Sequence, residues 1–176
     1  MKRIVLPLAG VALLAVLLGG RHLWVIGEEA MSTQSAKIEE GKPFRLFNPD
    51  GMAKPTAGYS QVAEVSGGKI VYIAGQVALD KAGNFVGKDD FRAQAEQVFE
   101  NLKSAVEAAG GDFHSVVKLN YYCAGSVPPE QIAAVREIRD KYVNTANPPT
   151  STFVFVQRLV RPEWLIEVDA VAVVKR

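Results

Sequence analysis

The sequence has one cysteine, two histidines and a formal net charge of only +1, and each scarcity excludes a class of protein. Its single cysteine, Cys123, allows no disulfide bond within the chain. With only His22 and His114 beside it, the chain lacks the residues that a structural zinc site requires. The balanced charge lacks the basic excess of nucleic-acid-binding proteins. We therefore expect neither a metal site nor a nucleic-acid partner.

The composition is that of one globular domain. Hydrophobic residues make up 48% and charged residues 22% of the sequence. A chain of 176 residues is too short for two ordinary domains plus a tail. Residues 31–43 are polar and without periodicity, which predicts a flexible linker. Residues 44–176 remain for the domain.

The first 30 residues differ from the rest of the chain. Lys2 and Arg3 precede an uncharged run, Ile4–Gly20, which is slightly long for a secretory signal and short for a membrane span. We predict that residues 1–30 are a signal peptide or a membrane anchor, and the protein's only contact with a membrane if uncleaved. The domain would then be exported, as a periplasmic protein or anchored facing outward. Alternatively, synthesis starts at Met31 and the protein is cytoplasmic.

Three strands are expected before the first helix. The first covers Phe44–Phe47 and ends at a turn. Two strand-like runs follow, Tyr59–Val65 and Ile70–Val77. The residues between them, Ser66–Gly68, predict that these two runs form a hairpin.

Two helices are predicted from apolar residues at helical spacing. The first starts after a capping aspartate, Asp89 or Asp90, and ends at Gly110–Gly111. The second begins at Pro128–Glu130. The residues that this second helix is expected to bury are Ile132, Val135, Ile138 and Tyr142. Its charged residues, which we expect on a solvated face, are Glu130, Arg136, Glu137, Arg139 and Lys141.

The remaining strands complete an α/β (α+β) pattern. They are expected at Val116–Ala124, Thr152–Gln157 and Trp164–Val174. Strands separated by helical connections indicate βαβ units, here with both helices on one face of a mixed sheet. The other face must be buried in another way. Because Val171 and Val173 lie on it, we expect oligomerisation to cover them.

Alternation along the last strand assigns its side chains to two faces. One face carries Ile166, Val168, Ala170 and Ala172. The other carries Leu165, Glu167, Asp169 and Val171. A carboxylate within an apolar strand is costly unless it is paired, hydrogen-bonded or hydrated. Glu167 and Asp169 therefore either form ion pairs between subunits or line a cleft in which a carboxylate activates water.

Four segments together match one family pattern. They are the strand Tyr72–Asp80, the helix within Gln94–Gly110, the next strand at Val117–Lys118 and the strand Leu165–Ala172. With these segments in this order, the chain from about Phe47 to Lys175 resembles the Rid family, whose members are also called YjgF-like or RidA-like and were formerly described as endoribonuclease L-PSP. The resemblance implies a chorismate-mutase-like fold and a homotrimer with clefts between subunits. It also implies hydrolysis of enamines and imines, such as 2-aminoacrylate, to 2-oxo acids and ammonia.

The resemblance further implies a set of site residues, at which this chain departs from the family. Glu167 matches the glutamate that handles water and is the candidate catalytic residue. The candidate substrate-binding residues are Tyr59, Ala74, Gly75, Arg136, Thr150 and Thr152. The family's substrate-binding arginine lies in a Pro-x-Arg-Ser motif, where this chain has Thr150, and a threonine cannot neutralise a carboxylate. A displaced cation would have to come from Arg136, Arg158 or Arg161.

Two functional hypotheses of different classes follow. The first is a Rid-family protein that hydrolyses enamine- or imine-type intermediates to a carbonyl product and ammonia, with a substrate altered by the threonine at position 150. The second is a non-catalytic ligand-binding or interaction trimer. RNA hydrolysis is disfavoured by the balanced charge and by the lack of a histidine pair for acid–base work. No cofactor is expected, because the sequence has neither a Gly-rich phosphate loop nor metal-ligand spacing.

Overall fold

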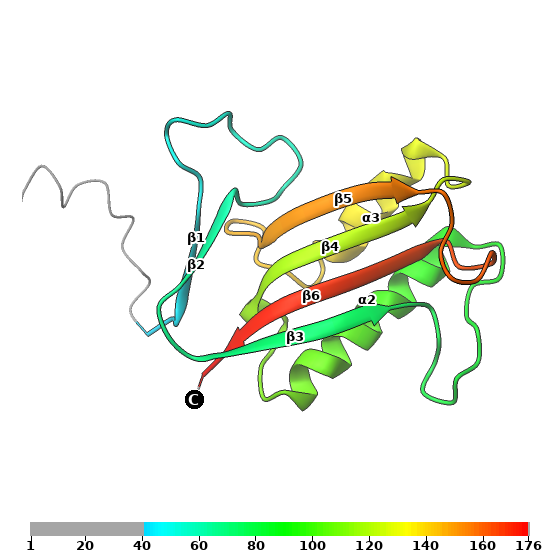
Figure 1. Cartoon of the computed structure of the whole chain (residues 1–176), viewed down its shortest axis with the longest axis horizontal. Coiled ribbons are helices and arrows are strands. Elements are labelled where there is room, and N and C mark those ends of the chain that lie inside the picture. The colour runs from blue at the N-terminus through cyan, green and yellow to red at the C-terminus, as the bar shows by residue number, and fades with distance from the viewer. Residues whose placement is uncertain (1–40, 176) are drawn as a thin grey trace, which may run out of the picture. The chain divides into compact units, whose positions relative to one another are not determined.

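The computed structural model of the chain describes residues 41–175, where two α-helices lie on one side of a β-sheet (Figure 1). In chain order the elements are β1 (Phe44–Phe47), β2 (Val62–Val65), β3 (Lys69–Gln76), α2 (Phe91–Ala108), β4 (Val116–Ala124), α3 (Ile132–Arg139), β5 (Thr150–Val156) and β6 (Ile166–Val174). The predicted signal or anchor, and most of the predicted linker, lie outside the described residues. Within residues 41–175, no helix has the length and apolar character that crossing a membrane requires.

The main sheet has four strands in the order β3-β6-β4-β5. Strand β6 is antiparallel to both of its neighbours, whereas β4 and β5 run parallel. The strand that comes last along the chain therefore lies in the middle of the sheet. This arrangement confirms the expected mixed sheet with both helices on one face (Figure 1).

The core lies between the sheet and the helices. Helix α2 starts after Asp90, whose carboxylate accepts a hydrogen bond from the Ala93 backbone N–H, and this confirms one of the two expected caps. The apolar side of the helix packs on the predicted inner face of β6, and both sides are buried. The residues concerned are Ala95, Val98, Phe99, Leu102 and Val106 of α2, and Ile166, Val168, Ala170 and Ala172 of β6.

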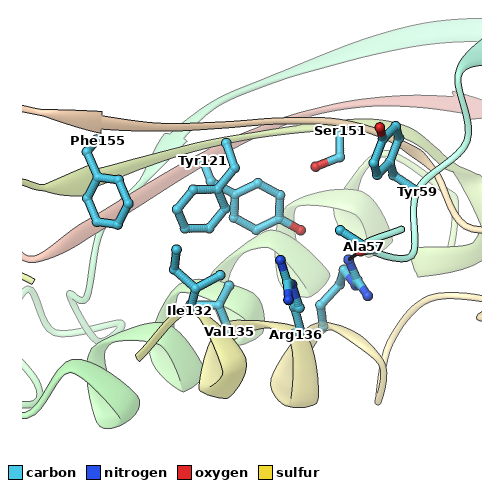
Figure 2. A pocket seen from close by; sticks show the side chains of 10 residues that line it. Ala57, Tyr59, Tyr121, Ile132, Val135, Arg136, Ser151 and Phe155 are labelled. Atoms are coloured by element: carbon cyan, nitrogen blue, oxygen red, sulfur yellow. Dashed lines mark hydrogen bonds between the residues drawn. The ribbon is translucent and has the colours of Figure 1, made fainter. Parts of the chain in front are cut away.

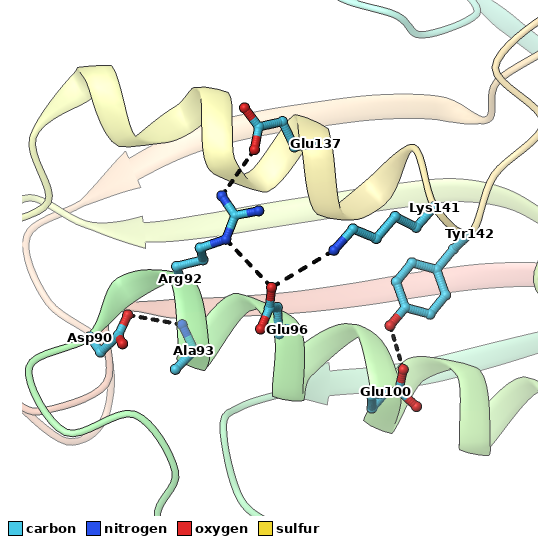
Figure 3. Close-up of polar contacts among 8 residues, drawn as sticks. All are labelled: Asp90, Arg92, Ala93, Glu96, Glu100, Glu137, Lys141 and Tyr142. Carbon is cyan, nitrogen blue, oxygen red and sulfur yellow. Dashed lines mark hydrogen bonds and ion pairs between the residues drawn. The ribbon is translucent and has the colours of Figure 1, made fainter.

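Polar side chains join α2 to the α3 region at their outer surface (Figure 3). Arg92 lies between two carboxylates, with Nη1 2.9 Å from Glu137 and Nε 3.5 Å from Glu96. The Tyr142 hydroxyl donates to Glu100 over 2.5 Å. Burial, followed by this hydrogen bond, raises the pKa of Tyr142. Of these contacts, the ion pair of Arg92 with Glu137 joins α2 directly to α3.

The second helix differs from its predicted form in two respects. A 3₁₀ turn, Pro129–Gln131, precedes α3, and Tyr142 lies beyond the end of the helix, although its ring still packs on Phe99 at 5.4 Å. The expectation of a solvated Arg139 is wrong, since that residue is only 8% exposed. Its guanidinium is held by the Asp140 carboxylate and by a backbone carbonyl, which offset the cost of burying the charge.

The prediction that residues 59–65 and 70–77 pair as a hairpin is wrong. Strand β2 pairs with β1 in a separate two-stranded sheet, and β3 pairs with β6. The predicted turn is present at Ser66–Gly68. It requires glycine, because Gly68 has a φ of +81° and a Cβ there would lie 2.7 Å from the Val174 carbonyl oxygen. The turn redirects the chain from one sheet to the other. Strand β3 pairs with β6 from Lys69 to Gln76, a longer stretch than the four residues of β2.

The small sheet covers one end of the face that the helices leave open. Phe44 packs with Val117 and Val173 in a second apolar cluster. Val173 is consequently only 2% exposed, so the expectation that another subunit must bury it is wrong. Elsewhere on this open face large apolar side chains remain exposed. They are Ile70, Tyr72 and Val154.

Candidate functional site

Glu167 lies near the start of β6 on the open face, opposite Tyr122 of β4. The ladder between β3 and β6 is irregular from Ile73 to Gln76, and this bulge places Gly75 against Glu167. A Cβ on Gly75 would lie 1.9 Å from Glu167 Oε1. No side chain fits at position 75 while Glu167 keeps this position. The placement of the Glu167 side chain therefore depends on a glycine at position 75.

The two carboxylates of β6 are in different states. Asp169 accepts hydrogen bonds from Asn120 Nδ2 at 2.8 Å and from the Tyr122 hydroxyl at 3.0 Å, so its own subunit satisfies it. The second of these bonds raises the pKa of Tyr122. Glu167 accepts no hydrogen bond from residues 41–175. Burial, with a smaller effect of the Asp169 charge, raises the pKa of Glu167. Glu167 is therefore the carboxylate suited to proton transfer.

A cavity of about 260 Å³ adjoins Glu167. It is lined by Tyr122, Val156, Arg158, Leu159, Val160 and Glu167. Arg158 Nη1 donates to the carbonyl oxygens of Leu159 at 3.2 Å and Val160 at 3.3 Å. No carboxylate of residues 41–175 lies within ion-pair distance of it. Of the three arginines considered as a displaced cation, Arg158 is the one in this cavity.

The predicted residues of β5 and β3 lie on the open side with Glu167. Thr152 is exposed and pairs in register with Asn120. The Thr150 hydroxyl donates to the Val117 carbonyl at 2.9 Å, so it already has a partner. Ala74 is exposed within the bulge of β3, beside Gly75. Alternation along the strands explains this grouping.

Tyr59 and Arg136 lie in a different cavity, between α3 and β5 (Figure 2). Its volume is about 390 Å³, and Ser151 and Phe153 of β5 line it from the helix side of the sheet. One subunit therefore separates the predicted set into two sites on opposite faces of β5. Sequence reasoning missed Ser151 and Tyr121 as lining residues, although alternation along each strand places them on the helix side.

The described residues hold little other reactive chemistry. No group of three histidine, cysteine, aspartate or glutamate side chains in residues 41–175 is placed to hold a metal ion. Cys123 is buried, and burial raises the pKa of its thiol to about 12, so the thiol is not nucleophilic near neutral pH. His114 lies exposed in the 3₁₀ turn Phe113–Ser115. Acid–base chemistry in this part of the chain therefore centres on Glu167.

Comparison with known proteins decides the family. The sequence model of the family described as Endoribonuclease L-PSP matches residues 51–174. The chain belongs to this family, the Rid family. It is 35% identical over 129 residues to Protein DfrA from Myxococcus xanthus, covering 73% of this chain and 95% of that relative. It is 27% identical over 133 residues to a protein named 2-iminobutanoate/2-iminopropanoate deaminase from Dermatophagoides farinae, covering 76% of this chain and 98% of that one.

A solved structure shows the same Rid fold. The crystal structure of YyfB from Yersinia pestis, described as a protein of unknown function in the Rid family, has a TM-score of 0.67 and 33% sequence identity to this chain. The alignment covers 76% of this chain and all of YyfB, 100%. The family and the fold expected from the sequence resemblance are thereby confirmed.

Proposed function

We propose that this Rid-family chain forms a homotrimer in which Glu167 positions water to hydrolyse an imine-type bond in a small substrate. The observation that carries the proposal is a half-buried carboxylate with a raised pKa and no donor among residues 41–175. It lies beside a cavity that also holds the Arg158 guanidinium, which has no carboxylate partner in the same part of the chain. The deaminase name of the Dermatophagoides farinae relative supports this reaction class. The products are a carbonyl compound and ammonia.

The proposed reaction needs one group that accepts and then returns a proton. Glu167, as the carboxylate, takes a proton from water while the water oxygen forms a bond to the imine carbon. With the imine bound in its protonated form, this addition gives a carbinolamine, and the protonated Glu167 returns its proton to the nitrogen. The C–N bond then breaks and ammonia leaves, while the Glu167 carboxylate takes the remaining hydroxyl proton as the carbonyl forms and finally passes that proton to ammonia. A pKa raised toward neutral pH suits both steps.

Among residues 41–175, Arg158 is the cation that lines the Glu167 cavity. We expect Arg158 to bind the substrate's anionic group, because the guanidinium lines the same cavity and lacks a carboxylate partner among residues 41–175. Thr150 does not serve this purpose, since its hydroxyl bonds to Val117. The substrate anion would then lie near Val160 rather than at the start of β5.

The trimer part of the proposal concerns the open face. Tyr72 is 80% exposed and Ile70 48% exposed, in a sheet whose other face is covered by helices. Closed symmetric assembly buries such side chains. In the trimer, Tyr59 and Arg136 of one subunit would approach the open face of the next, which would complete the cleft around Glu167.

Kinetics with 2-iminopropionate test the role of Glu167. We expect Thr150→Arg to raise the rate of hydrolysis, because it adds a cation on the Glu167 side. The double change Thr150→Arg with Glu167→Gln should lose that gain. If Thr150→Arg keeps its oligomeric mass and shows no turnover, the catalytic proposal is wrong.

A second series tests the cation. Arg158→Gln should lower kcat/KM by a factor of about 30 to several thousand, the range for losing a charged partner of a buried anion. Arg161→Gln is the matched control, because Arg161 lies over the Trp164 ring and does not line this cavity. Equal effects of the two changes would exclude a specific role for Arg158.

The alternative is a ligand-binding trimer without catalysis. It is favoured by one observation: the hydroxyl at the position of the family's arginine bonds to its own backbone at Val117. On this alternative, the wild type and Thr150→Arg would bind imine-like ligands, detected as a rise in Tm, but neither would turn them over.

We propose export for the N-terminal segment. A reporter that is active only outside the cytoplasm, fused after Arg176, should work with the full chain. Deletion of residues 1–30 should abolish its activity. Equal activity with and without the segment would contradict export.

A further inference from the structure

The chain that leaves β3 is tied to α2 by one side chain, that of Asn101. Asn101 Nδ2 donates to the carbonyl oxygens of Val77 at 3.0 Å and of Leu79 at 2.8 Å. An asparagine amide carries two N–H donors, and both are used in these bonds. The helix therefore holds the chain directly after β3 at two points.

A second amide on α2 sets the direction of the first. Gln97 Nε2 donates to Asn101 Oδ1 at 2.8 Å, and both side chains are partly buried. Residues four apart on a helix lie on the same face, so the two amides meet without distorting α2. Because Oδ1 accepts this bond, Nδ2 is turned toward the two carbonyl oxygens. The orientation of Asn101 is thus fixed from the helix side.

The bulge of β3 lies immediately before these contacts. Regular pairing with β6 ends at Ile73, and the next paired residue of β3 is Gln76, opposite Val168. Gly75 lies in the irregular stretch between them. The path of the backbone at Gly75 is therefore determined by the ladder before it and by the contacts of Asn101 after it.

We propose that Asn101 is a positioning residue for Glu167, because it holds the chain after β3 on α2 and so keeps Gly75 against the Glu167 carboxylate. A Cβ at position 75 would overlap Glu167 Oε1, so even a small displacement of the bulge changes what surrounds that carboxylate. The catalytic meaning of this role rests on the proposed reaction of Glu167. The structural effect does not depend on that reaction.

Asn101 can act on Glu167 only through the backbone of β3. The titratable groups around Glu167 are Asp169 on its own strand, Tyr122 of β4 and Arg158 of the connection between β5 and β6. The hydrogen bonds of Asn101 reach none of these groups, and its side chain is neutral. Burial is the larger cause of the raised pKa of Glu167. Movement of the bulge would therefore change that pKa by changing the hydration of the carboxylate.

The pKa of Glu167 in the full-length protein tests the proposal. It is measured from the ¹³C shift of the Glu167 carboxyl carbon, whose signal is identified by its absence in Glu167→Gln. Asn101→Leu keeps the size and neutrality of the side chain but donates to neither carbonyl. We expect this variant to lower the pKa of Glu167 toward its ordinary value near 4.5. Gln97→Leu should lower it less, and it provides the test if Asn101→Leu does not fold.

Two further variants separate positioning from a general loss of stability. Val106→Ala, in the fully buried part of α2 near its C-terminal end, should lower Tm without changing the pKa of Glu167. Gly75→Ala should displace the Glu167 side chain directly and lower its pKa. Adding Asn101→Leu to Gly75→Ala should then change the pKa less than Asn101→Leu does alone, because both changes act on the same contact.

The results distinguish this inference from the proposed function. An unchanged pKa in both Asn101→Leu and Gln97→Leu overturns the positioning role, even if hydrolysis depends on Glu167. An equal fall of the pKa in Val106→Ala also overturns it, since the effect would then be one of general stability. A lowered pKa in Asn101→Leu, with no turnover of 2-iminopropionate by Thr150→Arg, supports the positioning role and contradicts the proposed reaction.

Discussion

Two polar side chains on opposite sides of the main sheet, Gln94 and Glu167, differ in how many hydrogen bonds they make. At the helix-covered side, the fully buried Gln94 has its bonds satisfied by the backbone of Gly87, Glu163 and Leu165. On the open face, Glu167 is half-buried and no donor from residues 41–175 reaches it. The covered side also holds the main apolar core, so we expect that side to carry most of the stability of the fold. On the open face, the Glu167 carboxylate can still accept hydrogen bonds from water, a ligand or another subunit.

The largest predicted loss of stability comes from a substitution in the core on the helix-covered side. Phe99→Ala should lower the free energy of unfolding by about 3–5 kcal/mol, because Phe99 is fully buried and packs on Phe113 and Tyr142. Met52→Ala, at a half-exposed position, should change it by less than about 0.5 kcal/mol. Urea denaturation measures both. A loss below about 1 kcal/mol for Phe99→Ala would mean that stability does not reside on the covered side.

The next effect concerns the buried amide. Gln94→Leu keeps the size of the side chain but leaves the Glu163 carbonyl and the Leu165 N–H without partners, and it should cost about 2–4 kcal/mol. The Gly87 carbonyl keeps its hydrogen bond from the Asp90 backbone N–H. The same change at the exposed Gln131 should cost little. Thermal and urea unfolding of the two variants check this. If Gln94→Leu and the Gln131 variant were equally stable, water would be replacing the Gln94 amide, and the helix-covered side would be more open to water than the structure shows.

On the open face we expect loss of assembly with the subunit fold retained. Tyr72→Glu places a charge where the proposed trimer buries a ring, so light scattering should show the mass falling to that of one chain. The circular dichroism spectrum should keep its shape, because Tyr72 contributes little to the core. A wild-type protein that is monomeric at micromolar concentration would contradict the trimer.

The smallest effect is the pH dependence at Glu167. Its raised pKa means that folding favours the protonated form, so this contribution is present below the ordinary value near 4.5 and is lost as pH rises through the folded-state value. Glu167→Gln should therefore leave Tm unchanged near pH 4 and raise it slightly at pH 7. Asp169→Asn should instead lower Tm, since it alters the acceptor of two hydrogen bonds. A lower Tm for Glu167→Gln at pH 7 would contradict the assigned pKa shift.

Local patterns in the sequence predicted the local parts of the fold. The cap at Asp90 and the two faces of β6 follow from spacing along a single element, and both are found in the structure. The pairing of β2 with β1 depends on which strands compete for β6, and nothing local encodes that choice. Likewise, Arg139 belongs to a charged helix in the sequence, and only the approach of the Ala57 loop buries it.

The candidate site was predictable only in part for a similar reason. The resemblance placed Glu167 and Gly75 together, and they do touch. It could not show that Tyr59 and Arg136 lie on the opposite face of β5 from Glu167 within one subunit. The family pattern says which residues line a cleft, but it does not say which of them one subunit contributes. The Tyr121 hydroxyl has no hydrogen-bond partner within residues 41–175, and the sequence gives no sign of this, because a buried tyrosine with a partner has the same sequence pattern.

The central position of β6 also determines when the protein can fold during its synthesis. Strands β3, β4 and β5 leave the ribosome before it, and two of them, β3 and β4, have β6 between them. Until residues 166–174 emerge, β3 has no partner in the main sheet and the inner face of β6 cannot close over α2. Folding of the main sheet therefore follows synthesis of β6.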